Sequence, residues 1–236
     1  MRTLSSTRRR YLSNFLAIAL AISGLQFVFV VPASAITPTA PSLSWTSTSM
    51  TGLTGSGWGV ATSANGAVVF IATSPTAQLS TNYGVTFSPV SATTNKFNGW
   101  MMNAAMSADG QKIFYASGRT IIYSHNGGSS WTETAAGPSD AIWGLSASSD
   151  GTKLIAGFAG NGYMSSENSG VSWSWVNTGT RTLISISDDG SKILVVVNGQ
   201  APKVGPIGGT LTSLNIGNTT AQADWRAAVY DSTCTR

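Results

Sequence analysis

Cysteine, histidine and charged residues are all scarce in this chain of 236 residues. The single cysteine, Cys234, excludes an intramolecular disulfide and a cysteine-based zinc site. The single histidine, His125, excludes a metal site built from several histidines. Charged residues make up only 9% of the chain and hydrophobic residues 42%, so a disordered chain is excluded as well. We expect no metal and no cofactor.

The N-terminus carries a group of basic residues followed by an apolar run. Arg2 and Arg8–Arg10 precede residues 15–31, and this run ends at Pro32 and the small residues Ala33-Ser34-Ala35. That layout predicts a secretory signal peptide at residues 1–35, cleaved after Ala35. An uncleaved anchor is the alternative, because the seventeen residues from 15 to 31 are near the minimum for a spanning helix. We expect a secreted or cell-surface protein with no membrane span after signal cleavage.

The net charge of +4 belongs to the same N-terminal segment. Removing its four arginines from the thirteen Lys and Arg residues leaves nine, which balance nine Asp and Glu residues. The mature protein therefore has no basic surface in excess, and nucleic acid is not an expected partner.

Two turn motifs recur along the rest of the chain. Asn-Gly or Asp-Gly pairs, whose glycines are 44, 41 and 39 residues apart, each precede β-branched or aromatic residues: Asn65-Gly66, Asp109-Gly110, Asp150-Gly151 and Asp189-Gly190. Such pairs predict tight hairpins. A second motif, Ser-x-Asn-x-Gly-x-Ser/Thr-aromatic, follows the first three pairs: Ser80, Asn82, Gly84 and Phe87; Ser124, Asn126, Gly128 and Trp131; Ser166, Asn168, Gly170 and Trp173. There we expect Asn to bond the turn backbone, Gly to adopt a conformation that other residues resist, and the aromatic ring to pack between sheets.

The second motif resembles the Asp-box, or BNR, repeat, whose pattern is Ser-x-Asp-x-Gly-x-Thr-Trp, with Asn here in place of Asp. That family occurs in sialidases, sortilin-type receptors, endoglucanases and photosystem assembly propellers. The resemblance covers about residues 43–229 and implies an all-β, propeller-like array of four-stranded antiparallel blades within residues 36–236. The repeats span approximately 58–90, 100–134, 143–176 and 182–214, with a partial fifth from 225. This gives about four to five blades, and the sequence leaves open a fragment or a full-length protein.

In such blades the antiparallel strand order places both kinds of turn at one end. The remaining connections lie at the other end, which we call the loop face, and variable connections favour ligand binding. Candidate binding residues there are Trp100, Arg119, Asp140, Trp143, Arg181 and Trp225. The tryptophans could form a platform for sugars or peptides, or could instead pack between blades. Asp140 and Arg181 could instead be solvated loop charges.

No catalytic residues are predicted. A sialidase would need three converging arginines and a Tyr-Glu pair, but the chain has only Glu133 and Glu167 as glutamates. An endoglucanase-like site needs two facing carboxylates, and the acids not committed to turns are Asp140, Asp224 and Asp231. The leading hypothesis is an exported, non-enzymatic binding or cell-surface module that recognises a glycan or a protein. The alternatives are a degenerate or truncated glycoside hydrolase, sialidase-like or endoglucanase-like, and an extracytoplasmic assembly factor.

Overall fold

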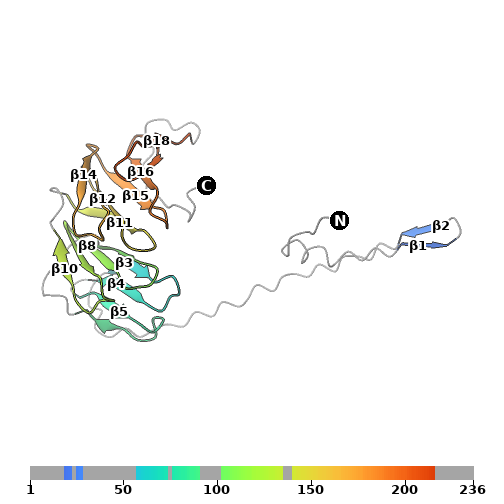
Figure 1. The fold of residues 1–236 in the computed structure, drawn as a ribbon, viewed down its shortest axis with the longest axis horizontal. Helices are drawn as coiled ribbons and strands as arrows, with labels where there is room; N and C mark the ends of the chain where they lie inside the picture. The colour runs from blue at the N-terminus through green and yellow to red at the C-terminus, as the bar shows by residue number, and fades with distance from the viewer. Residues whose placement is uncertain are drawn as a thin grey trace. The chain divides into compact units, whose positions relative to one another are not determined.

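The computed structural model describes residues 19–22, 25–28, 57–73, 76–90, 102–134 and 140–215 (Figure 1). The predicted cleavage site after Ala35, the candidates Trp100 and Trp225, and the partial fifth repeat lie outside these ranges. The chain divides into two units, residues 1–46 and 47–236. In the first unit the described residues form one antiparallel hairpin of β1 (Ala19–Ile22) and β2 (Leu25–Val28). The described residues include no helix with the length and hydropathy needed to cross a membrane.

Four antiparallel sheets, each of four strands in chain order, account for the described strands of the second unit. We call them the first to fourth blades. The first has β3 (Gly57–Thr62), β4 (Val69–Thr73), β5 (Gln78–Ser80) and β6 (Ser88–Pro89); the second has β7 (Met102–Met106), β8 (Ile113–Ser117), β9 (Thr120–Ser124) and β10 (Thr132–Thr134). The third has β11 (Ile142–Ala147), β12 (Leu154–Phe158), β13 (Gly162–Ser166) and β14 (Ser174–Asn177); the fourth has β15 (Thr182–Ile186), β16 (Ile193–Val197), β17 (Lys203–Gly205) and β18 (Thr212–Ser213). The predicted all-β class of four-stranded antiparallel blades is confirmed.

Consecutive blades pack face to face through their middle strands. In β8, Tyr115 packs against Phe70 of the first blade with ring centroids 5.9 Å apart, while Phe114 packs with Leu154 of the third blade. Every residue of β8 and of β12 is buried. A strand that is covered on both faces needs apolar side chains at successive positions, which explains the hydrophobic runs Ile113-Phe114-Tyr115 and Leu154-Ile155-Ala156.

The second-hairpin turns, between the third and fourth strands of a blade, share one hydrogen-bond network. In the second blade the Ser124 hydroxyl donates to Asn126 Oδ1 at 2.9 Å and accepts the Gly128 N–H at 2.9 Å. Asn126 Oδ1 accepts the Ser130 N–H at 2.9 Å, and its amide donates to the Ser130 hydroxyl at 2.8 Å. The same bonds recur around Ser80 and Ser166. The predicted bond from Asn to the turn backbone is therefore confirmed.

The aromatic residue that ends this motif joins two blades. The Trp131 indole donates to the Gly128 carbonyl at 3.0 Å, and its ring centroid lies 5.5 Å from that of Phe70 in the preceding blade. Trp173 donates to the Gly170 carbonyl at 3.0 Å and packs with Phe114 of the preceding blade. Gly128 and Gly170 have φ angles of +88° and +84°, a region that glycine adopts more readily than other residues. Packing between sheets, predicted for these rings, is thus confirmed for both tryptophans.

The first-hairpin turns, between the first and second strands, depend on a serine that sequence reasoning missed. The motif is Ser-x-Asx-Gly, and its serines are Ser63, Ser107, Ser148 and Ser187. Each hydroxyl donates to the Asx side chain two residues later at 2.6 to 2.8 Å. Each also accepts the backbone N–H five residues later at 2.9 to 3.0 Å. The serine therefore closes the turn from inside.

The carboxylates in these turns are held in their ionised form. Hydrogen bonds from the Ser187 hydroxyl and the Ser191 backbone lower the pKa of Asp189 to about 2. At Asp150, partial burial favours the neutral form, but hydrogen bonds from Ser148 and Thr152 outweigh it and lower the pKa to about 2. Unfolded aspartate titrates near pH 3.9. Each lowered pKa therefore stabilises the fold fully above about pH 4, and this stabilisation is lost as the pH falls towards 2.

We predict that the free energy of unfolding of the mature protein is flat from pH 7 to 5 and falls steeply between pH 4 and 2. Urea titrations followed by tryptophan fluorescence at several pH values measure this dependence. Asp150→Asn should make the slope shallower, because one of the titrating carboxylates is gone. An equally steep slope in the variant would show that Asp150 does not contribute to the acid sensitivity.

The fourth blade forms its second hairpin without the motif. Residues 205–212 lack the Ser, Asn and aromatic positions, yet β17 and β18 pair through Lys203 with Ser213 and Val204 with Thr212. Pro206 and the positive φ of Gly208, +69°, make the turn instead, closed by a 3.2 Å bond from the Gly209 N–H to the Pro206 carbonyl. Ile207 and Leu211 supply the apolar contacts to the core.

Candidate functional site

Trp143 stands out of the regular pairing of the third blade. In the β11–β12 pair, Ile142 lies opposite Phe158 and Gly144 opposite Gly157, so Trp143 is an extra residue in a β-bulge. A bulge redirects a side chain away from the sheet's alternating pattern. Trp143 is half-buried and belongs to none of the apolar clusters that contain Trp131 and Trp173. Packing in the inter-blade core, the alternative for this tryptophan, is therefore not what its surroundings show.

Arg181 covers the ring of Trp143. Its guanidinium carbon lies 5.2 Å from the ring centroid, a distance at which the positive charge is attracted to the aromatic face. Arg181 belongs to the connection between the third and fourth blades, and its carbonyl accepts the Asn198 N–H at 3.1 Å. The loop backbone thus fixes the place from which the guanidinium reaches the ring. Two residues predicted separately for the loop face are in contact.

Asp140 is tied to the adjacent turn of its own blade. The Asn161 amide, in the β12–β13 turn, donates a hydrogen bond to Asp140 Oδ2. The Asn161 carbonyl in turn accepts the Thr178 N–H at 3.2 Å, which joins this turn to the connection that carries Arg181. Asp140 is half-buried and engaged as an acceptor, so a fully solvated loop charge does not describe it.

Arg119 reaches the same region from the second blade. It is exposed in the β8–β9 turn, where the Gly118 carbonyl accepts the Ile142 N–H at 2.7 Å. The Asn103 amide donates to the Ile142 carbonyl at 3.3 Å. The residue before Trp143 is therefore anchored on both sides to the second blade. We refer to Arg119, Asp140, Trp143, Asn161 and Arg181 as the Trp143 cluster.

The chemistry available to the Trp143 cluster is recognition. It has two cationic side chains, one carboxylate, one amide and one aromatic ring. Among the residues that the structure describes, no three His, Cys, Asp or Glu side chains come together as a metal site would require. Asp224 and Asp231, the acids that could oppose Asp140, lie outside the described ranges, as do Trp100 and Trp225.

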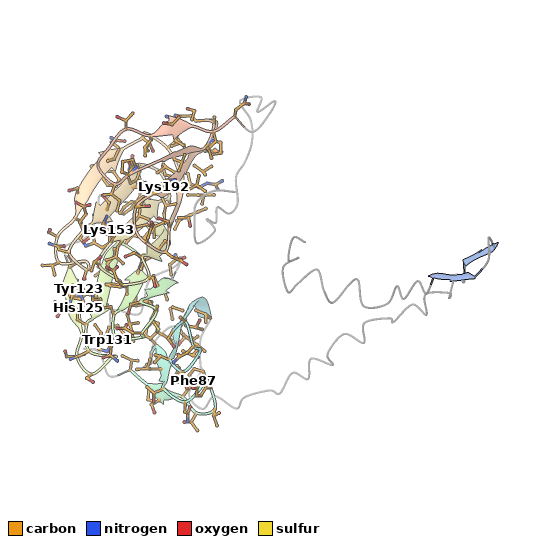
Figure 2. All side chains as sticks on the ribbon, turned by 45° about the vertical axis from the view of Figure 1, so that its right-hand side comes forward. Phe87, Tyr123, His125, Trp131, Lys153 and Lys192 are labelled. Carbon is orange, nitrogen blue, oxygen red and sulfur yellow. The ribbon has the colours of Figure 1, made fainter. Side chains whose placement is uncertain are left out.

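His125 illustrates a contact that sequence reasoning missed. The residue was expected to be an exposed loop residue and is exposed, but its Nε2 lies 2.8 Å from the Ser169 carbonyl of the third blade. Its ring also stacks on Tyr123, with centroids 4.6 Å apart (Figure 2). Both contacts lie at the turn end of the blades, away from the Trp143 cluster. His125 therefore links two second-hairpin turns.

Comparison with known proteins identifies the fold. No protein-family model matches the sequence, and no curated protein matches it. A GH74 enzyme from Niastella koreensis is similar, with 27% sequence identity and a TM-score of 0.55 over 70% of this chain and 25% of that one. An ancestral GH74 enzyme is 16% identical, with a TM-score of 0.58 over 76% of this chain and 28% of that one.

A GH74 xyloglucanase from Xanthomonas campestris is 17% identical, with a TM-score of 0.50 over 67% of this chain and 25% of that one. The present chain thus spans only about a quarter of the length of these enzymes. At such identities the second and third similarities concern the fold alone. Together with the four successive antiparallel blades, they show that the chain has a fold of the β-propeller type.

Proposed function

We propose that the protein is an exported, non-enzymatic propeller module that recognises a glycan or a protein through the Trp143 cluster. The observation that supports this most strongly is the bulge that removes Trp143 from the sheet pattern and places it under Arg181. Bulges are common beside functional sites, where they redirect one side chain. The ring offers an apolar face for stacking, and the surrounding polar groups offer orientation.

The charges of the cluster suggest what a ligand must supply. Arg119 and Arg181 are donors only, while Asp140 already accepts the Asn161 amide. A ligand therefore needs acceptor oxygens for the guanidinium groups and an apolar surface for Trp143. The hydroxyl-bearing rings of a glycan meet both needs, and so does a protein loop with carboxylate and aliphatic side chains. Stacking and hydrogen bonds are sufficient for binding without any bond being broken.

We also propose that the second-hairpin turns are Asp-box repeats in which Asn replaces Asp. The support is the network around Ser124 and Asn126, which uses the side-chain oxygen as the acceptor for the turn backbone. Asparagine keeps that acceptor and adds a donor, which the Ser130 hydroxyl accepts at 2.8 Å. The repeats then have a structural role and lie at the opposite end of the blades from the ligand.

A degenerate glycoside hydrolase is the second candidate. Its support is the 27% identity to the GH74 enzyme from Niastella koreensis. Hydrolysis would require a second carboxylate facing Asp140 at a distance suited to acid and base or nucleophile roles. Asp140 is the acid of the Trp143 cluster and is bonded to an amide rather than to another acid. Binding without turnover is therefore the preferred proposal.

The mature protein is expected to bind at least one immobilised glycan or cell-surface protein, and Trp143→Ala should weaken that binding about tenfold or more. The reason is that a stacked aromatic side chain contributes on the order of 1 kcal/mol or more at such surfaces. A glycan array and a pull-down from cell-surface protein, followed by calorimetry of each hit, provide the measurement. Xyloglucan is included as a probe because one of the structural neighbours is a xyloglucanase.

The matched control is Trp175→Ala. Trp175 is 39% exposed and packs edge-on against Phe158 at 5.0 Å within β14, away from the loop face. Its removal tests the general effect of losing a surface tryptophan. Equal affinity loss in both variants, or none in Trp143→Ala, would contradict the assignment of the binding site.

A further inference from the structure

The first-hairpin turns of neighbouring blades are joined by a directional ladder of backbone hydrogen bonds. The Ala64 N–H donates to the Ala108 carbonyl at 2.8 Å, and the Ala108 N–H donates to the Ser149 carbonyl at 2.7 Å. The Ser149 N–H then donates to the Asp188 carbonyl at 2.7 Å. These four residues hold the same position, directly after the serine, in their four turns. Each turn is therefore a donor towards the next blade and an acceptor towards the previous one.

A side chain reinforces each step of this ladder. The residue five positions after the turn serine, which we call the knob, lies over the glycine of the next turn, which we call the socket. A methyl group on each socket glycine would come within 2.7 to 2.9 Å of the knob side chain: Val68 over Gly110, Lys112 over Gly151 and Lys153 over Gly190. The Lys112 and Lys153 amines also donate to turn carbonyls, those of Asp150 at 2.9 Å and Gly190 at 3.1 Å.

One knob and one socket are left over at opposite ends of the four blades. Lys192 is the exposed knob of the fourth blade, and no described residue accepts its amine (Figure 2). Gly66 is the socket of the first blade, and no atom lies within 4 Å of a methyl group placed there. The ladder is open at the same ends, since within the described ranges the Asp188 N–H and the Ala64 carbonyl have no hydrogen-bond partner.

The outer face of the first blade is exposed as well. Val60 lies opposite Ile71 in the β3–β4 pair, on the face away from Phe70 and the second blade. Its side chain is 62% exposed, which is unusual for valine in the middle of a strand. Residues 1–56 and 216–236 contain no further Ser-x-Asx-Gly sequence that could supply another socket or turn.

We propose that a second copy of this chain completes both ends. Lys192 of one copy fills the Gly66 socket of the other and donates to a carbonyl of the Asn65-Gly66 turn, while the Asp188 N–H donates to the Ala64 carbonyl. The contact joins two different surfaces, and the two surfaces meet twice when two copies close on each other. Four blades from each copy make eight in the ring, within the usual range for propellers. Closure leaves no open sheet at either end.

Light scattering and sedimentation equilibrium of the purified mature chain test this proposal. We expect twice the mass of one chain, and we expect Lys192→Glu to raise the dissociation constant of the pair at least tenfold, because a carboxylate would face turn carbonyls. The control is Lys203→Glu, since the Lys203 amine bonds Gln200 within its own blade at 3.1 Å. A monomeric wild-type chain, an open filament, or a pair that Lys192→Glu leaves intact would overturn the proposal.

A covalent trap tests the register of the contact. Ala64→Cys and Asp188→Cys are combined in a Cys234→Ser background, because both positions are exposed and would face each other across the closed interface. Mild oxidation should give disulfide-linked pairs of copies in high yield. Ala64→Cys combined with Lys203→Cys is the matched control and should stay unlinked. Equal linking in both variants would show that collisions alone produce the product and would overturn the assigned contact.

Discussion

Gly157→Ala is expected to lower the free energy of unfolding by about 3 kcal/mol. Gly157 lies in β12 at the contact between the third and fourth blades, and a methyl group there would overlap the backbone carbonyl oxygen of Thr182. A backbone atom cannot move aside by changing a rotamer, so β15 would have to shift as a whole. Overpacking of this kind typically costs about 1 to 3 kcal/mol and sometimes more. Urea unfolding of both proteins measures the difference.

Gly144→Ala is the matched control for this prediction. Gly144 lies directly opposite Gly157 in the β11–β12 pair. A methyl group on it would be 3.5 Å from Ile184 Cδ1, which is an ordinary contact. The change should cost less than about 1 kcal/mol. Equal losses in the two variants would mean that the spacing of the third and fourth blades does not depend on Gly157.

Ser148→Ala is expected to cost about 2 kcal/mol of stability. The Ser148 hydroxyl donates to Asp150 Oδ1 at 2.6 Å and accepts the Lys153 N–H at 3.0 Å. The residue is 1% exposed, so alanine leaves these groups unpaired where water does not readily replace the hydroxyl, at a cost of about 1 to 3 kcal/mol. Thermal and urea unfolding provide the measurement.

Ser149→Ala controls for the loss of a serine hydroxyl from the same turn. Ser149 is exposed, and its contribution to the inter-blade ladder comes from its backbone, which alanine retains. We expect a change within about 0.5 kcal/mol, as for most surface substitutions. Similar losses at both positions would refute the view that the buried serine closes the turn.

The blades could be predicted from the sequence because their local signals agree with their packing. The turn at Asp150-Gly151 and the buried run from Leu154 mark the first hairpin of the third blade, and both appear as expected. The strand ends were less certain. The last strand of that blade, expected to begin at Val171, begins at Ser174, because the hydrogen bonds of the second-hairpin turn extend to Trp173.

The motif was not a complete guide to the second hairpins. The fourth blade closes through Pro206 and Gly208 without a serine or asparagine, since the buried strands β16 and β17 already fix the register. The turn serines such as Ser148 escaped notice for the opposite reason. Serine is common in this chain, and only the structure shows that one particular hydroxyl is buried inside each first-hairpin turn.

The Trp143 cluster was predicted only in part. Strand order was enough to assign Asp140, Trp143 and Arg181 to one end of the blades. The bulge at Trp143 could not be foreseen, because it depends on how Ile142 and Gly144 pair with β12. The contact between Arg181 and Trp143 likewise arises from loops of two successive blades, which sequence spacing does not determine.

Product analysis after prolonged incubation with glycans tests the central claim most directly. The purified mature protein is mixed with xyloglucan, other β-glucans and sialosides, and released sugars are measured by chromatography beside a binding assay on the same samples. We predict that any glycan bound through Trp143 is recovered intact and that Asp140→Asn changes no product. Release of sugars by the wild-type protein, abolished by Asp140→Asn in a variant that still binds, would contradict the non-enzymatic account and establish a hydrolase.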